Sequence, residues 1–292
     1  MKKLLKALTK ADKMVINVLL CIILMSAAVA CLTSCSQMEE SEAVKDVPTN
    51  VSITFSPYDI APMTRTATSI ATIATKLDVW IYENGSEVAA VHQSSSDVGF
   101  GSVSLTLDKT KTYTLYAIAH KSDGATLSDG VISFTDDKVT HAMYYSTTFS
   151  PATTTSLSCL MTRIVALFRL TITDEIPAAV KKLRFTISNV FDRWNVSTGG
   201  TNQIDRTSAI TYGGTAANFS VYAITTDAQT LHTVTVTALD ASDNELQTRT
   251  FENVPLRNGY RTQYTGTFFI DTPTSAAFTV ESDWTDFDTV TF

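Results

Sequence analysis

The segment VSITF, residues 51–55, alternates apolar side chains with serine and threonine. Such alternation places every second side chain on the same face of an extended strand. The pattern recurs along the chain, with threonine, valine and aromatic residues enriched as in strands generally. Its apolar positions in three further segments are Leu77, Val79 and Ile81; Val103, Leu105 and Leu107; and Val234, Val236 and Ala238. These segments predict strands with one face toward water.

Turn-forming residues separate the predicted strands at intervals of about ten residues. They cluster at residues 83–86, 122–124, 128–130, 198–200, 212–214 and 240–244. Short strands at such intervals are typical of β-sandwiches rather than of parallel sheets. Helix signals are sparse: residues 176–183 form a candidate short helix with Pro177 in its first turn, and residues 67–74 are ambiguous. We therefore predict an all-β fold.

A break in the strand pattern divides the chain. Pro151 and the threonines at residues 153–155 interrupt the alternation. Beyond this break lies RIVALFRLTI, residues 163–172, the most apolar segment after the N-terminal region, which predicts a central strand. The interpretation is two tandem β-sandwich domains, an N-terminal one over residues 50–155 and a C-terminal one over residues 156–292.

The first 34 residues have the order of a secretory signal peptide. Five lysines precede residues 15–32, a segment without charge. Its length is near the lower limit for a membrane-spanning helix, so a retained anchor is the alternative. Two cleavage sites compete: residues 28–30 (AVA), which suit an ordinary signal peptidase, and residues 32–35 (LTSC), which resemble a bacterial lipobox.

The lipobox predicts that Cys35 receives a diacylglycerol and becomes the first residue of the mature protein. A single acyl chain gives only marginal membrane binding, whereas two or three chains hold a protein on a membrane for long periods. Residues 35–49 then form an acidic tether that resembles, in a weaker form, the surface-export signal of Bacteroidota lipoproteins. We expect attachment to the outer membrane through Cys35, with the protein facing outward.

Charge and cysteine content narrow the function classes. Removal of residues 1–34 takes away five of 22 basic and one of 29 acidic residues, which leaves a formal charge of about −11. Such a chain has no basic surface for nucleic acid or anionic lipid, so the lipid must provide the anchoring. Besides the acylated Cys35, only Cys159 remains, which excludes an intramolecular disulfide. We expect Cys159 to be a small buried hydrophobe.

Five segments of the chain together resemble the FimB-like anchor subunits of Bacteroidota fimbriae, within the type V pilus superfamily. They are residues 62–65 (PMTR), 77–82 (LDVWIY), 113–120 (YTLYAIAH), 160–177 (LMTRIVALFRLTITDEIP) and 254–269 (VPLRNGYRTQYTGTFF). The resemblance runs from about Val51 to about Phe269. It separates the pilin superfamily from other sandwiches better than it separates anchor from shaft or tip subunits.

The resemblance implies two transthyretin-like domains, a lipoprotein precursor and assembly by strand exchange. In related shaft subunits, an arginine-specific protease removes the N-terminal strand, and a neighbour's strand fills the opened groove by β-augmentation. The function implied is a lipid-anchored structural subunit of a cell-surface fimbria that anchors the pilus to the outer membrane. Its partners would be subunits of the same pilus, with host or bacterial surface ligands as further candidates.

Arg65 distinguishes an anchor from a shaft subunit. It follows the first predicted strand in a polar segment where a protease has access. Cleavage there would remove both that strand and Cys35, which a shaft or tip subunit requires and an anchor does not survive. The alternative is that Arg65 is an ordinary solvated arginine.

The C-terminal end, after residue 276, contains apolar residues among acidic ones: Ala277, Phe278, Val280, Trp284, Phe287, Val290 and Phe292. Two interpretations remain: the end closes the second sandwich as an acidic edge strand, or it docks with the next subunit.

Catalytic and metal-binding motifs are absent from the sequence. The four histidines, His92, His120, His141 and His232, lie far apart, and no motif of a hydrolase, metalloprotease or phosphate loop occurs. A triad assembled in space remains open. Two acidic clusters, residues 240–245 and 281–288, lack the spacing of a calcium loop and are interpreted as solvated turns. We predict no enzyme activity, cofactor or metal.

A glycan-binding surface lipoprotein is the alternative from another function class. Trp80 and Trp194, with Tyr82, Tyr144 and Tyr145, are candidates for a stacking platform. Trp80 shares its strand face with Asp78 rather than with the apolar positions, which leaves its exposure open.

Overall fold

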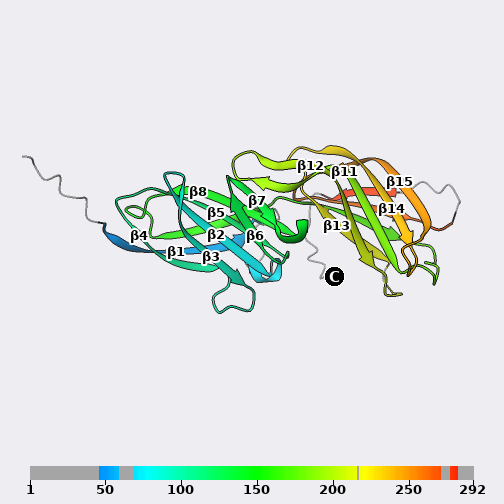
Figure 1. The fold of residues 1–292 in the computed structure, drawn as a ribbon, viewed down its shortest axis with the longest axis horizontal. Helices are drawn as coiled ribbons and strands as arrows, with labels where there is room; N and C mark the ends of the chain where they lie inside the picture. The colour runs from blue at the N-terminus through cyan, green and yellow to red at the C-terminus, as the bar shows by residue number, and fades with distance from the viewer. Residues whose placement is uncertain (1–45, 59–68, 216, 271–276, 282–292) are drawn as a thin grey trace, which may run out of the picture. The chain divides into compact units, whose positions relative to one another are not determined.

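The computed structural model describes residues 46–58, 69–215, 217–270 and 277–281. Over these residues the chain forms seventeen β-strands, two three-residue 3₁₀ helices and no α-helix. The prediction of an all-β fold is confirmed. Figure 1 labels most of the strands.

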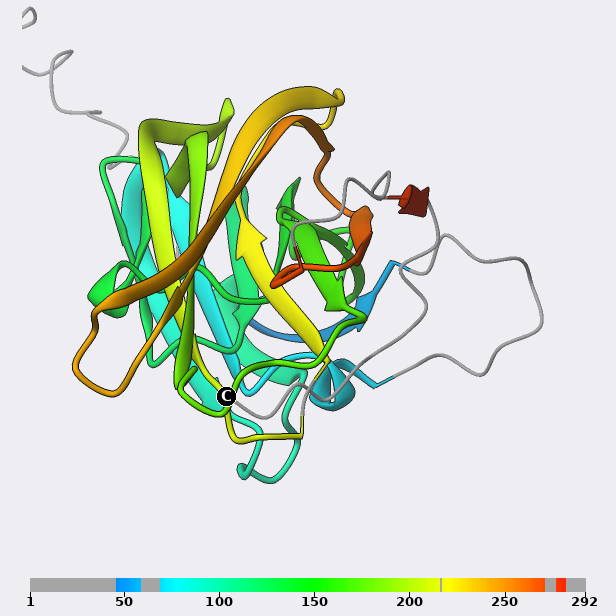
Figure 2. The ribbon, with the colours of Figure 1, turned by 90° about the vertical axis from the view of Figure 1, so that its right-hand side faces the viewer.

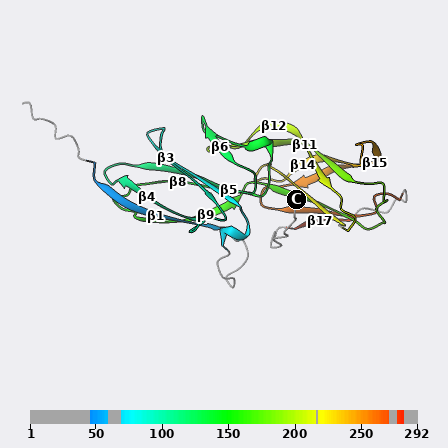
Figure 3. The same ribbon diagram turned by 60° about the horizontal axis from the view of Figure 1, so that its bottom comes forward.

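The first sheet has seven strands and folds over on itself into two layers (Figure 3). Its order is β3-β2-β5-β8-β9-β1-β4. The strands are β1 (Pro48–Pro57), β2 (Lys76–Glu83), β3 (Ser86–Ser94), β4 (Ser102–Asp108), β5 (Tyr113–His120), β8 (Ala142–Phe149) and β9 (Ser156–Arg163). Only two residue pairs join β8 to β9, so the sheet turns a corner there. Buried side chains from both layers, such as Ile53, Leu77 and Leu115, form the core between them.

Two further sheets enclose a second core. The four-stranded sheet has the order β13-β10-β16-β17, and the six-stranded sheet has the order β15-β14-β11-β7-β6, with β12 paired to β11. The strands are β6 (Ala125–Ser128), β7 (Val131–Phe134), β10 (Ala166–Ile172), β11 (Lys182–Asn195), β12 (Gly199–Thr211), β13 (Asn218–Ala223), β14 (Thr230–Leu239), β15 (Glu245–Leu256), β16 (Arg261–Gly266) and β17 (Ala277–Glu281). Phe168 and Phe185 pack edge to face inside this core.

The central strand expected at residues 163–172 is present as β10. It lies inside its sheet, antiparallel to β13 and parallel to β16, and six of its seven residues are buried. The prediction of a buried inner strand is therefore confirmed, although Arg163 belongs to β9. On the neighbouring sheet β14 and β15 form a long bent hairpin, yellow to orange in Figure 2. Two register shifts interrupt its pairing, and such irregularities bend strands.

The β6–β7 hairpin connects the two halves of the chain. β7 pairs with Arg193–Asn195 of β11, so a hairpin from the first half extends a sheet of the second half. A third buried cluster lies here and includes Trp80, Ile132 and Leu167. β9 follows the predicted boundary at residue 155 and yet pairs with β1 and β8. The first sheet thus continues to Arg163, and the division into two transthyretin-like domains remains a prediction.

The structure does not contain the candidate short helix at residues 176–183, so this prediction is wrong. This segment forms a single turn, closed by the Val180 N–H bonding to the Pro177 carbonyl, and β11 begins at Lys182. From Lys182 onward the chain pairs with both β12 and β14. These backbone hydrogen bonds outweigh the weak local preference for a helix. The ambiguous residues 67–74 contain the 3₁₀ helix Ile70–Thr72.

Candidate functional site

The N-terminal strand β1 occupies an interior position in its sheet. It pairs antiparallel with β4 and parallel with β9 (Figure 3). Val51, Ile53 and Phe55 are 1%, 0% and 5% exposed, because the period-two alternation turns them all into the core. Removal of β1 would therefore leave two unpaired strand edges and an open apolar slot between β4 and β9.

The predicted lipid and cleavage sites flank β1 in the sequence. Cys35 and Arg65 both lie outside the described residues. The backbone N–H of Tyr58 still bonds to the Met161 carbonyl at 2.7 Å, and the described chain then resumes at Ser69. Acylation of Cys35 and cleavage at Arg65 remain predictions. The same holds for the signal peptide, residues 1–34.

At the other end of the chain, Asp174 and Arg249 hold residues 268–270; we call this arrangement the C-terminal clip. The Asp174 carboxylate accepts the backbone N–H groups of Phe268, Phe269 and Ile270 at 2.7, 2.6 and 2.9 Å. Arg249 donates to the carbonyls of Phe268 and Ile270 at 2.5 and 2.9 Å. The clip fixes the chain before β17, which pairs antiparallel with β16 as the outermost strand of its sheet.

The C-terminal clip predicts an acid-sensitive contribution to stability from Asp174. Burial raises the pKa of this carboxyl, but the hydrogen bonds from the three N–H donors lower it by more. The net shift of the pKa is therefore downward. A carboxyl with a depressed pKa in the folded state stabilises above its ordinary pKa of about 3.9 and loses that contribution as the pH falls.

Asp174→Asn is therefore expected to cost about 1–3 kcal/mol at neutral pH. The asparagine amide has only one acceptor oxygen. Its NH2 group would face the backbone N–H groups, which are themselves donors. Urea unfolding at pH 7 and pH 3.5 measures the effect, and the difference between the two chains should shrink at the lower pH. Equal stability at pH 7 would contradict the role of the clip.

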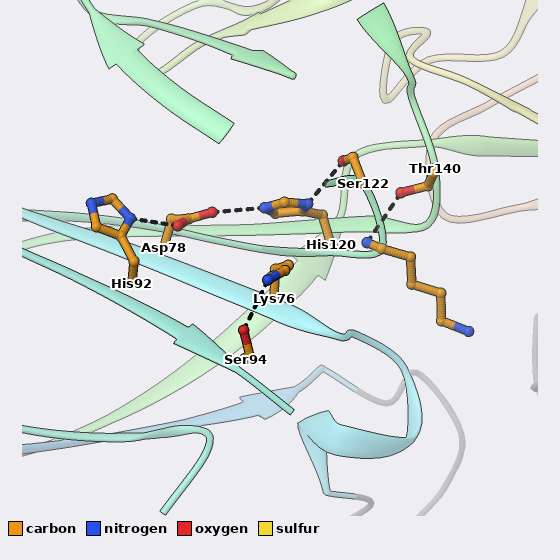
Figure 4. A network of polar contacts seen from close by, with 8 residues as sticks. Lys76, Asp78, His92, Ser94, His120, Ser122 and Thr140 are labelled. Carbon is orange, nitrogen blue, oxygen red and sulfur yellow. Dashed lines mark hydrogen bonds and ion pairs between the residues drawn. The ribbon is translucent and has the colours of Figure 1, made fainter. Parts of the chain in front are cut away.

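A buried polar network lies at one end of β2, β3 and β5 (Figure 4). His92 Nδ1 lies 2.6 Å from Asp78 Oδ1, and His120 Nε2 lies 2.7 Å from Asp78 Oδ2. Ser122 Oγ lies 2.8 Å from His120 Nδ1. Each carboxylate oxygen of Asp78 thus faces a histidine ring nitrogen, and the second ring nitrogen of His120 faces the Ser122 hydroxyl.

This chain of contacts has the connectivity of a Ser-His-Asp triad, with the ring nitrogens of the histidine exchanged. Its hydroxyl, however, does not face solvent: Ser122 is 3% exposed and His120 is 0% exposed. A nucleophile needs room for a substrate beside it. The arrangement instead satisfies buried polar groups and fixes the ends of three strands, with His120 also packing edge to face on Phe134.

The network predicts unequal costs for its two histidines. His92 exposes 58% of its side chain and can bond to water instead, whereas His120 cannot. Replacing His120 with alanine is expected to cost about 2–4 kcal/mol, because it leaves a buried carboxylate short of a partner. His92→Ala is expected to cost less than about 1 kcal/mol. Urea unfolding of both variants tests this, and equal losses would refute the structural assignment.

The two tryptophans predicted as glycan contacts do not form an open platform. Trp80 is 3% exposed because β2 is covered on both faces, so its ring offers no face to solvent. Trp194 is half-buried and packs at a tilt on Tyr144, with ring centroids 5.6 Å apart. Its indole N–H is buried and finds no acceptor in the described part of the chain. Tyr145 packs against the first core.

Other predicted positions have structural roles. Cys159 is fully buried in the first core, and burial raises the pKa of its thiol to about 12, as expected for a small hydrophobe. Asp240 accepts the N–H groups of Ser242 and Asn244, which confirms a turn there. Of the second acidic cluster, residues 283–288 lie outside the described residues. Where the structure describes the chain, no cluster of acidic, histidine or cysteine side chains is placed to hold a metal.

The sequence analysis missed the network around Asp78. One signal was present: Asp78, Trp80 and Tyr82 share a strand face whose polar and aromatic composition differs from a plain solvent face. The partners come from β3, β5 and the turn after it, which only the sheet register brings together.

Known proteins resemble this chain in structure rather than in sequence. It matches no protein-family model and no curated protein. A candidate adhesin from Bacteroides ovatus is 14% identical, with 80% of this chain and 95% of that chain covered and a TM-score of 0.52. A candidate polysaccharide-binding protein from Bacteroides thetaiotaomicron is 11% identical over 80% and 96% of the two chains, with a TM-score of 0.51.

The chain shares its fold with these Bacteroidota proteins. The fimbrial anchor protein Mfa2 from Porphyromonas gingivalis also matches, at 11% identity over 81% of this chain and 98% of that one, with a TM-score of 0.46. The two neighbours from Bacteroides confirm the fold, and membership of the fimbrial anchor family remains a prediction. Over the described residues, the chain has no helix with the length and apolarity to span a membrane.

Proposed function

We propose that this chain is a lipid-anchored structural subunit of a cell-surface fimbria. In this proposal the acylated Cys35 holds it in the outer membrane, and contacts between strands join it to subunits of the same pilus. The single observation that supports it best is the interior position of β1, between β4 and β9. This strand connects the predicted membrane attachment directly to the core of the folded protein.

An anchor requires that β1 stay in place. Force on the filament would pass from the first core through β1 to residues 35–47 and then to the lipid. Two hydrogen-bonded ladders and three buried side chains hold β1 against such a pull. The slot of β1 is then filled by the chain's own residues, so the next subunit has to bind elsewhere.

The C-terminal sheet offers such a place. β17 is its outermost described strand, and an outermost strand presents unpaired backbone groups to a partner. The neighbour's strand either adds to β17 or replaces it on β16, which is β-augmentation in both cases. The C-terminal clip would keep the chain in register up to Ile270 while this exchange takes place.

The mature N-terminus decides between anchor and shaft. Mass spectrometry of protein recovered from isolated fimbriae should find an acylated Cys35, and Cys35→Ala protein should leave the membrane fraction. A chain that begins at Thr66 would overturn the anchor proposal and identify a shaft or tip subunit that has lost β1. Arg65→Ala provides the matched control, because it should change nothing in an anchor and should block maturation of a shaft subunit.

A further inference from the structure

A pocket of about 410 Å³ opens where the β10–β11 connection meets the β12–β13 connection. It is lined by Glu175, Ile176, Ala178, Val180, Lys181, Tyr212, Gly213 and Gly214. Its volume lies toward the lower end of the roughly 300–1,000 Å³ that is typical of small-molecule sites. None of these lining residues belongs to β1 or β17, and Glu175 directly follows Asp174 of the C-terminal clip.

Short-range contacts hold the walls of the pocket in place. The Tyr212 N–H donates to the Lys181 carbonyl at 2.8 Å, which ties one connection to the other. The Lys181 ammonium donates to the Ala178 carbonyl at 2.8 Å, and the Tyr212 ring packs on Phe219 with centroids 6.1 Å apart. A site that is already formed before binding loses little entropy when it takes a ligand.

The pocket presents polar groups that the described residues do not satisfy. The Glu175 carboxylate, the Tyr212 hydroxyl and the N–H groups of Gly213 and Gly214 bond to no other group among the described residues. The Lys181 ammonium has donor capacity beyond its one bond. The lining therefore combines these donors and acceptors with the apolar side chains of Ile176 and Val180, and its two charged groups, Glu175 and Lys181, have opposite signs.

We propose that this pocket binds a neutral sugar of one or two rings. Adjacent hydroxyl groups of a sugar donate and accept at once, so they match a lining with a carboxylate acceptor and several N–H donors. The carbon–hydrogen faces of the ring pack on Tyr212 and Ile176, as aromatic and aliphatic side chains favour. Opposite charges of equal size in the lining disfavour a strongly charged ligand.

Glycine labelling makes the proposal directly testable on the full chain in detergent micelles. The protein has eleven glycines, so ¹⁵N-glycine labelling gives eleven amide signals, two of them from the pocket. Gly213 is the glycine of the only Tyr-Gly step in the sequence, so carbonyl-labelled tyrosine assigns its signal. Neutral mono- and disaccharides of hexose and N-acetylhexosamine should shift the signals of Gly213 and Gly214 and leave the other nine unchanged.

Variants separate this site from unspecific binding. Glu175→Gln, at an exposed position, is expected to weaken the sugar about tenfold by removing a charge-assisted hydrogen bond. Tyr212→Ala should abolish the shifts, whereas Tyr58→Ala, which removes a tyrosine that is 48% exposed elsewhere, should not affect them. If Tyr212→Ala fails to fold, Glu175→Gln alone decides. Shifts caused only by sialylated sugars or short peptides, or no shift at Gly213 with any saccharide, would overturn the proposal.

Discussion

A chain that lacks residues 48–57 is expected to lose the structure of its first sandwich and to regain it when the peptide PTNVSITFSP is added. This peptide has the sequence of β1. Val51, Ile53 and Phe55 are almost fully buried, and each contributes roughly 1.5–3 kcal/mol by burial. Their combined loss of roughly 5–9 kcal/mol approaches the whole stability of an ordinary domain.

Circular dichroism of the aromatic region follows loss and recovery of the fold, and fluorescence anisotropy of a labelled peptide measures its affinity. The matched control is the same peptide with Ile53→Asp, which would place an unpaired charge in the core and should not restore the fold. A truncated chain that unfolds at the same urea concentration as the intact one would contradict this prediction.

The result bears on assembly because it asks whether the β1 slot accepts a strand from another molecule. Recovery by the free peptide would show that covalent attachment of β1 is not needed for the slot to be filled. A shaft subunit depends on accepting a strand from another molecule in this slot. In an anchor the slot stays filled by its own β1. The complementation experiment and the mature N-terminus therefore report on different steps.

Much of the fold follows from period-two patterning. The segments around Ile53, Val79 and Val236 are strands, because one apolar face and one polar face leave few other ways to bury the chain. β10 was identifiable as an inner strand from its almost unbroken apolar run. These inferences depend on side-chain chemistry within a few residues, which the sequence displays directly.

Contacts between distant segments were not predictable from the same patterns. β7 pairs with β11, and the Val196 N–H bonds to the Gly130 carbonyl beside this pairing. No pattern in the sequence around either segment indicates the contact. Trp80 packs in a buried cluster with residues of the β6–β7 hairpin, whereas its parity with Asp78 in the sequence left its exposure open. The sugar pocket likewise needs two connections that are about thirty residues apart in the sequence.

His141 forms an acid-sensitive contact between the two halves of the chain. Its Nε2 accepts a hydrogen bond from Arg163 Nε at 3.0 Å, so this nitrogen carries no proton. The imidazole stacks on Tyr222 of β13, with ring centroids 5.9 Å apart and planes 8° apart. Burial, followed by the positive charges of Arg163 and Lys121, holds the pKa of His141 well below its ordinary value of 6.5.

The sign of the pH dependence follows from this depressed pKa. Below pH 6.5 the unfolded chain binds a proton at His141 while the folded chain does not, so the free energy of unfolding falls as the pH is lowered. One such histidine changes the stability by at most about 1.4 kcal/mol per pH unit. Over the two pH units from 6.5 to 4.5 the loss from His141 is therefore at most about 2–3 kcal/mol.

His141→Gln isolates this contribution, because glutamine remains neutral and still offers an oxygen to Arg163. Urea unfolding from pH 7.5 to pH 4.5 should give a shallower decline for the variant than for the unchanged chain. Hydrogen exchange of residues 139–142 and 218–223 should accelerate on acidification in the unchanged chain, and less so in the variant. His232→Gln serves as the comparison, since His232 bonds to the Ser188 carbonyl and the Thr230 hydroxyl rather than to an arginine. Parallel pH profiles for the unchanged chain and His141→Gln would show that the contact does not respond to acid.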